Sequence, residues 1–315
     1  MPVVLNDPIY WPLIDSNIFL SYWIVAAAAV VVYDWVLTID QEIELIWKQR
    51  WSFMTVLYLV IRYIGMPFSL MNFLRIMPLV SLTDTVSNIM TNTLNWISVA
   101  VAAMLGAIMT IRLYAMYERS RIMLMFLVIV FLAVNIACGV ITAIGLKNDP
   151  AVEVILSGTH VCEPVGTDQL LVSIVWILNS VWEFLALCLA LWIAVKQFRG
   201  LRRLDLSTGS TIGDCFRVLI QSHVLYFASF AGVSCLQLIS DLSPAILNSD
   251  SIGVRVLIGI LQIISVIQMF VLGPRLILSV RQLNAKLVVD SAAETFSMNS
   301  IVFQKHVHVS TSSTI

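Results

Sequence analysis

Long apolar runs separated by short polar stretches dominate the chain. Seven runs reach the roughly 20 residues that a helix needs to cross a bilayer. Each must be helical, because an unpaired backbone group in lipid costs several kcal/mol. The pattern therefore predicts an all-α, polytopic membrane protein with a bundle of seven transmembrane helices. The predicted spans are residues 18–39, 52–72, 91–115, 122–145, 170–195, 216–239 and 253–275.

These spans divide the chain into three parts: an extracellular N-terminus (1–17), a transmembrane domain (18–275) and a cytoplasmic tail (276–315). The tail is polar and ends in a Ser/Thr cluster, so we expect it to be mostly disordered. The longest outer connection runs from Leu146 to Gln169, and we expect no soluble domain.

The basic residues predict the orientation. Cytoplasmic loops of membrane proteins carry an excess of Lys and Arg. With the N-terminus outside, only Arg75, Lys147 and Arg255 fall on the outer side. The inner side then receives Lys48, Arg50, Arg112, Arg119, Arg121, Lys196, Arg199, Arg202, Arg203, Arg217, Arg275, Arg281, Lys286 and Lys305. The asymmetry predicts an outer N-terminus and a cytoplasmic C-terminus.

The composition agrees with a membrane protein. Of 315 residues, 59% are hydrophobic and 12% are charged, about half the roughly 25% charged residues of soluble domains. A net charge of −1 gives no reason to expect nucleic acid. The five cysteines show no metal-binding spacing, and we expect neither a metal nor a cofactor.

The most unusual stretch runs from Tyr33 to Met66 and joins the first two spans. Glu44 and Lys48 stand four residues apart, in the order that favours a helical ion pair. We interpret the stretch as an interfacial anchor and corner, with a docking surface for an unknown cytoplasmic protein as the alternative. The candidate corner residues are Asp40, Glu42, Glu44, Lys48 and Arg50.

The same stretch carries a family resemblance. The matching words are Tyr33-Asp34, Thr38-Ile39-Asp40, Glu42-Ile43-Glu44, Ile46-Trp47, Trp51-Ser52 and Arg62-Tyr63. They resemble the N-terminal domain of a fungal family, mainly from basidiomycetes, of multi-pass and usually seven-helix membrane proteins of unknown function. Looser matches are Arg112-Leu113-Tyr114-Ala115 and Gly273-Pro274-Arg275-Leu276. The resemblance implies a fold but brings no activity.

Many members of that family carry a Cys near the outer end of the third helix. This chain has Asn88, Asn92 and Asn95 there, so a bridge from that helix to Cys162 cannot form. Cys138 and Cys235 are the remaining partners near the outer face, and we expect Cys162 to be free.

Ionisable residues inside spans are functional candidates by default. The predicted intramembrane polar network comprises Asp34, Arg62, Glu183 and His223; the alternative is interhelical hydrogen bonding without a ligand. An unpaired Arg near mid-membrane costs about 2.5 kcal/mol or more. We therefore expect Arg62 to pair with Asp34 in the neighbouring helix, with Glu183 as the rival partner.

The function that the sequence favours is a receptor-like or sensor-like membrane protein of unknown ligand. Arg112 near the inner end of the third span is reminiscent of a receptor switch. The alternatives are a structural or partner-binding protein and, less favoured, a transporter. We expect no enzyme, because no paired aspartates or Ser/His arrangement lie within the spans. We expect the plasma membrane rather than an internal one.

Overall fold

The computed structural model of the chain describes residues 3–5, 11–49, 51–76, 83–117, 120–148, 151–156, 159–164, 169–204, 211–243, 251–282 and 285. Long helices make up most of them, and each predicted span lies inside one to within a residue. The helices are α1 (Trp11–Glu42), α2 (Phe53–Ile76), α3 (Asp84–Met116), α4 (Arg121–Asn148), α5 (Gln169–Leu204), α6 (Thr211–Leu242) and α8 (Ile252–Ile267).

Two π-helical segments extend these helices. Segment η2 (Ile43–Trp47) continues α1, and η3 (Gln268–Leu272) continues α8. The last helix then runs on to Gln282, beyond its predicted end at Arg275. Segment η2 lies beyond the predicted end of the first span at residue 39, so the corner between the first two helices is itself partly helical.

Within the described residues, six helices are long and apolar enough to cross a bilayer. The described part of α6 adds a shorter apolar stretch, Val224–Ser240. The outer faces of these helices are apolar. On α4, Ile122, Ile129 and Ile136 recur every seven residues and are each more than half exposed. Such a stripe needs an apolar surrounding, which lipid supplies. These findings confirm a mainly α-helical, multi-pass membrane protein.

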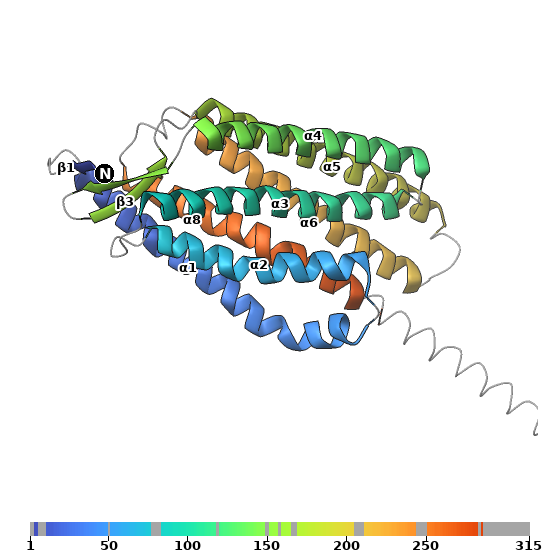
Figure 1. Ribbon diagram of the computed structural model, residues 1–315. Coiled ribbons are helices and arrows are strands. Elements are labelled where there is room, and N and C mark those ends of the chain that lie inside the picture. Colours follow the sequence, from blue (N-terminus) through green and yellow to red (C-terminus); the bar gives the residue numbers. More distant parts are fainter. Residues whose placement is uncertain are drawn as a thin grey trace, which may run out of the picture.

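The helices pack side by side (Figure 1), and their contacts close a ring. Each helix contacts the next along the chain, and α1 also contacts α8, which closes the ring. Helix α3 also contacts α5 across the ring. Fully buried side chains on α2 and α3, such as Tyr58, Ile61 and Val101, form the core.

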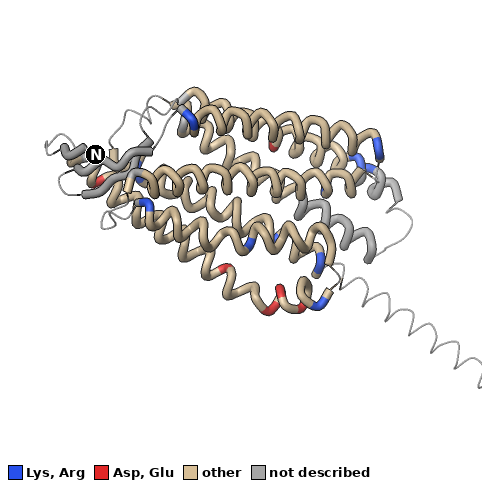
Figure 2. Tube along the Cα trace, viewed as in Figure 1, with Lys and Arg blue, Asp and Glu red and all other residues tan. Residues whose placement is uncertain are grey.

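One end of the bundle carries a small β-sheet, which the sequence analysis did not predict (Figure 1). Strand β1 (Val3–Leu5) pairs in parallel with β2 (Ala151–Leu156), which pairs in antiparallel with β3 (Thr159–Pro164). We call this the sheet end, and the opposite end, where η2 lies, the corner end. Charged residues are sparse along the middle of the bundle, with several acidic residues in the last turns of α1 (Figure 2).

Candidate functional site

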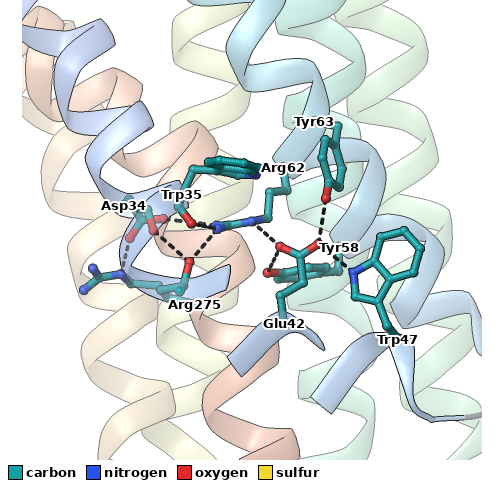
Figure 3. Close-up of polar contacts among 9 residues, drawn as sticks. Asp34, Trp35, Glu42, Trp47, Tyr58, Arg62, Tyr63 and Arg275 are labelled. Carbon is teal, nitrogen blue, oxygen red and sulfur yellow. Dashed lines mark hydrogen bonds and ion pairs between the residues drawn. The ribbon is translucent and has the colours of Figure 1, made fainter. Parts of the chain in front are cut away.

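Arg62 of α2 lies at the centre of a buried charged cluster near the corner end (Figure 3). Its Nε donates to Glu42 Oε2 at 2.7 Å, and its Nη1 donates to Asp34 Oδ2 at 3.2 Å. Its Nη2 donates to the Trp35 carbonyl oxygen at 2.9 Å and to Thr38 Oγ1. The predicted pairing of Arg62 with Asp34 is thus confirmed, and a second carboxylate shares the guanidinium.

Asp34 binds two arginines from opposite sides. Its Oδ1 accepts from Nε of Arg275 at 2.6 Å, while its Oδ2 accepts from Arg62. Arg275 lies in the last helix and its side chain is half exposed, whereas Asp34 is only 3% exposed. We call Asp34, Glu42, Arg62 and Arg275 the clasp. Its formal charges cancel, and it ties α1 to both α2 and the last helix.

Glu42 is the most buried member of the clasp, at 1% exposed. Besides Arg62, its carboxylate accepts from three hydroxyl or indole groups. Tyr63 Oη and Trp47 Nε1 donate to Oε1 at 3.0 and 3.1 Å, and Tyr58 Oη donates to Oε2 at 3.3 Å. Every carboxylate oxygen of the clasp therefore has a donor. Hydrogen bonds to charged groups are stronger than those between neutral groups.

Sequence spacing places these groups together. Asp34, Thr38 and Glu42 stand four residues apart, which puts them on one face of α1, and all three are buried. The π-helical segment then places Trp47 one turn from Glu42, five residues on. Glu42, a candidate corner residue, is buried because α1 continues through it and turns it towards Arg62.

Two further arginines fix the corner end. Arg281 donates to the Leu45 carbonyl oxygen at 2.7 Å and to Thr55 Oγ1, which ties the last helix to the corner. Arg112 of α3 donates to the carbonyl oxygen of Leu276 at 3.1 Å. Three helices thus converge on the segment of the last helix that carries Arg275.

The sheet-end half of the bundle contains a cavity of about 460 Å³ between α3, α4, α5, α6 and the last helix. Its lining begins near Arg75, Gly145 and Leu171 at the helix ends and reaches Met109 inside the bundle. Ligand pockets have volumes of about 300–1,000 Å³, so a small organic molecule fits this one.

Several polar atoms of the cavity have no partner among the described residues. They are Trp182 Nε1, Gln268 Oε1 and Thr91 Oγ1, whose residues are each less than 10% exposed. Glu183 also lines the cavity, and its carboxylate accepts from Ser234 Oγ. Buried polar groups are almost always hydrogen-bonded, so these orphan atoms indicate a place for a ligand or for water.

The structure separates the predicted residues. Asp34 and Arg62 belong to the clasp, whereas Glu183 lies in the cavity and is not a partner of Arg62, which excludes the rival pairing. Asp40, Glu44 and Lys48 are exposed, and no ion pair joins Glu44 to Lys48 among the described residues. Glu42, predicted as a corner residue, belongs instead to the clasp. Arg50 and the side chain of His223 lie outside the described part of the chain.

The sequence analysis also missed Arg275 as a partner of Asp34, because it assigned Arg275 to the cytoplasmic end of its span. Cys138 and Cys235 are free thiols, so neither candidate partner of Cys162 is bridged. The side chain of Cys162 itself lies outside the described residues.

Comparison with known proteins places one segment of the chain. Residues 22–67 match the model of a family of unknown function (DUF6533). The match contains the whole Tyr33–Met66 stretch and with it every clasp residue of α1 and α2. No curated protein matches the chain. The apolar helices indicate an integral membrane protein, and the family match assigns it no activity.

Proposed function

We propose that the chain is a receptor-like or sensor-like protein with seven spans, an outer N-terminus and a cytoplasmic C-terminus, in the plasma membrane. In this proposal a small molecule binds in the cavity, on the outer side. The clasp then holds or releases the helices on the cytoplasmic side. Seven long helices support the seven-span count, and the Lys and Arg distribution supports the orientation.

The observation that carries the proposal is the course of the last helix. Gln268 of this helix lines the cavity, and Arg275, seven residues on, pairs with Asp34 in the clasp. Gln268 begins the π-helical segment η3, and Pro274 lies between η3 and Arg275. Single-turn π segments inside helices are frequent at functional sites. A ligand that shifts Gln268 therefore has a direct mechanical route to Arg275.

The alternative is a structural or partner-binding membrane protein. The exposed charges Asp40, Glu44 and Lys48 at the corner end favour it, because they offer a polar surface to a cytoplasmic protein. In that case the clasp orients α2 and the cavity holds only water or lipid.

Topology is tested with epitope tags. An N-terminal tag is expected to be accessible on intact cells, and a tag placed after Lys305 only after permeabilisation. Two tags on the same side would contradict the seven-span model.

The receptor-like role is tested through coupling between the cavity and the clasp. A thermal-shift screen of the purified chain in lipid nanodiscs supplies a ligand. The Ala102→Phe variant fills the lining and should abolish its binding. Because coupling between sites is reciprocal and typically changes affinity at least fivefold, Arg275→Gln should alter the affinity although Arg275 does not line the cavity.

The matched control is Arg255→Gln, which removes an arginine from the opposite end of the same helix, where it pairs with the exposed Asp15. Its affinity should stay at the wild-type value. A ligand that binds wild type and Arg275→Gln equally well would favour the structural alternative.

A further inference from the structure

The polar lining of the cavity is rich in hydrogen-bond acceptors. Asn95, Asn135 and Asn179 each donate their side-chain NH₂ group to a carbonyl oxygen of their own helix, at 3.1, 2.8 and 3.0 Å. The amide oxygen of each of these side chains accepts from no donor among the described residues. Three amide oxygens are thereby left for an incoming donor.

Two further acceptors lie in the same cavity. Gln268 Oε1 is buried and has no partner among the described residues. Glu183 is the single acidic residue of the described lining, and Ser234 is its one hydrogen-bond donor there. A carboxylate accepts through about four lone-pair sites, so most of the accepting capacity of Glu183 is unused.

Basic residues and unpartnered hydrogen-bond donors are few in the cavity lining. Arg75 is the single basic residue among the described lining residues, and it lies in the last turn of α2, at the sheet end. Trp182 Nε1 is an unpartnered donor. Two indole rings, of Trp176 and Trp182, belong to the lining, and indole faces attract cations.

Resting on the proposed function, we propose that the cavity binds a small organic ammonium ion carried on an apolar body. An ammonium group has only donors, which matches the surplus of acceptors. Its N–H groups pair with the Glu183 carboxylate and with the amide oxygens of Asn179 and Gln268. Its body lies against the apolar lining, and Trp182 Nε1 donates to any acceptor that the body carries.

The test uses three probes of one shape and different charge: phenylbutylamine, phenylbutanol and phenylbutyrate. Binding to the full chain in nanodiscs of zwitterionic lipid is measured by thermal shift and by calorimetry. The amine is expected to bind at least tenfold more tightly than the alcohol, and the acid more weakly than either. Glu183→Gln should weaken amine binding at least tenfold and change alcohol binding less than twofold.

Two variants guard against indirect effects. Glu44→Gln removes an exposed acid at the corner end and should bind the amine like wild type. Gln268→Met removes the orphan acceptor without changing charge and should weaken the amine severalfold, which decides the matter if Glu183→Gln does not fold.

The outcomes separate this inference from the proposed function. If the alcohol or the acid binds best and Ala102→Phe abolishes that binding, the cavity is a ligand site but the ammonium proposal is wrong. Amine binding that survives both Glu183→Gln and Gln268→Met would also overturn it. If none of the probes, nor any library compound, binds in a way that Ala102→Phe abolishes, both proposals fail.

Discussion

The clasp and the cavity are both polar regions inside an apolar bundle, yet their hydrogen-bonding states are opposite. In the clasp, each carboxylate oxygen of Asp34 and Glu42 accepts from at least one donor of the protein. In the cavity, Trp182 and Gln268 keep buried polar atoms without partners, and Glu183 has a single hydroxyl donor. The polar groups of the clasp pair with one another, whereas the cavity keeps buried polar atoms that pair with no described residue.

This contrast indicates that the two regions affect stability in opposite ways. Helices in lipid gain little from apolar contact with one another, so polar ties and close packing hold them together. A saturated network such as the clasp therefore stabilises the bundle. Unsaturated polar groups around an open volume cost stability instead, and such a cost is typical of a binding site. Five substitutions test this difference.

Arg62→Gln should have the largest effect. It leaves two buried carboxylates with one arginine between them, and removing one partner of a buried ion pair costs about 3–5 kcal/mol. Asp34→Asn should cost less, because Glu42 still neutralises Arg62. The measurement is thermal unfolding in detergent, with Arg255→Gln as the control, because that arginine pairs with the mainly exposed Asp15. Equal losses for Arg62→Gln and Arg255→Gln would contradict the stabilising role of the clasp.

Gly106→Ala tests the packing of the cavity wall. A Cβ atom at Gly106 would lie 2.6 Å from Phe131 Cε2, and the Phe131 ring packs against Trp182. Overpacking of this kind costs about 1–3 kcal/mol. Gly232→Ala is the matched control, because a Cβ there meets nothing within 4 Å. If the two variants unfold at the same midpoint, Phe131 can shift without cost and the packing prediction is wrong.

Tyr63→Phe removes one donor to Glu42 and keeps the ring. A hydrogen bond to a charged group contributes about 1.5 kcal/mol or more, and Tyr63 is partly exposed, so we expect a loss of about 1 kcal/mol in unfolding free energy. Tyr33→Phe, at a mainly exposed tyrosine of the same stretch, should leave the unfolding midpoint unchanged. An unchanged unfolding free energy for Tyr63→Phe would mean that the remaining donors satisfy Glu42 without Tyr63.

Glu183→Gln should have the smallest effect on stability. The amide still accepts from Ser234, and the substitution removes a charge from an apolar surrounding, so the unfolding free energy should change by less than about 1 kcal/mol. The same unfolding assay without ligand measures it. A loss as large as that of Arg62→Gln would erase the distinction between the two regions.

The sequence predicted what the bilayer imposes. Span positions follow from the length of apolar runs, and the Asp34–Arg62 pair follows because a charged residue in lipid needs a nearby partner. The burial of Glu42 was also readable, since Asp34, Thr38 and Glu42 repeat every four residues. The sequence analysis missed it because it ended the first span at residue 39, before Glu42.

Other features depend on contacts that sequence spacing does not encode. Five helices and Arg75 at the end of α2 line the cavity, and Arg275 meets Asp34 only because the first and last helices are neighbours in the ring. The hairpin of β2 and β3 left a local signal, the Ser157-Gly158 turn dipeptide between short β-rich runs. Each strand of the hairpin has only six residues, so the sequence analysis treated the segment as a loop.

Asp34 acquires its two partners at different moments of synthesis. Arg62 follows it by 28 residues, but Arg275 follows it by 241. At about 5–20 residues per second, the ribosome delivers the second arginine tens of seconds after the first. Until then Asp34 and Glu42 share one positive charge, and the membrane-inserted chain carries an uncompensated carboxylate, which is costly in lipid. A chain that stops before its last helix keeps that surplus charge, so both carboxylates are neutralised only once the last helix has joined the bundle.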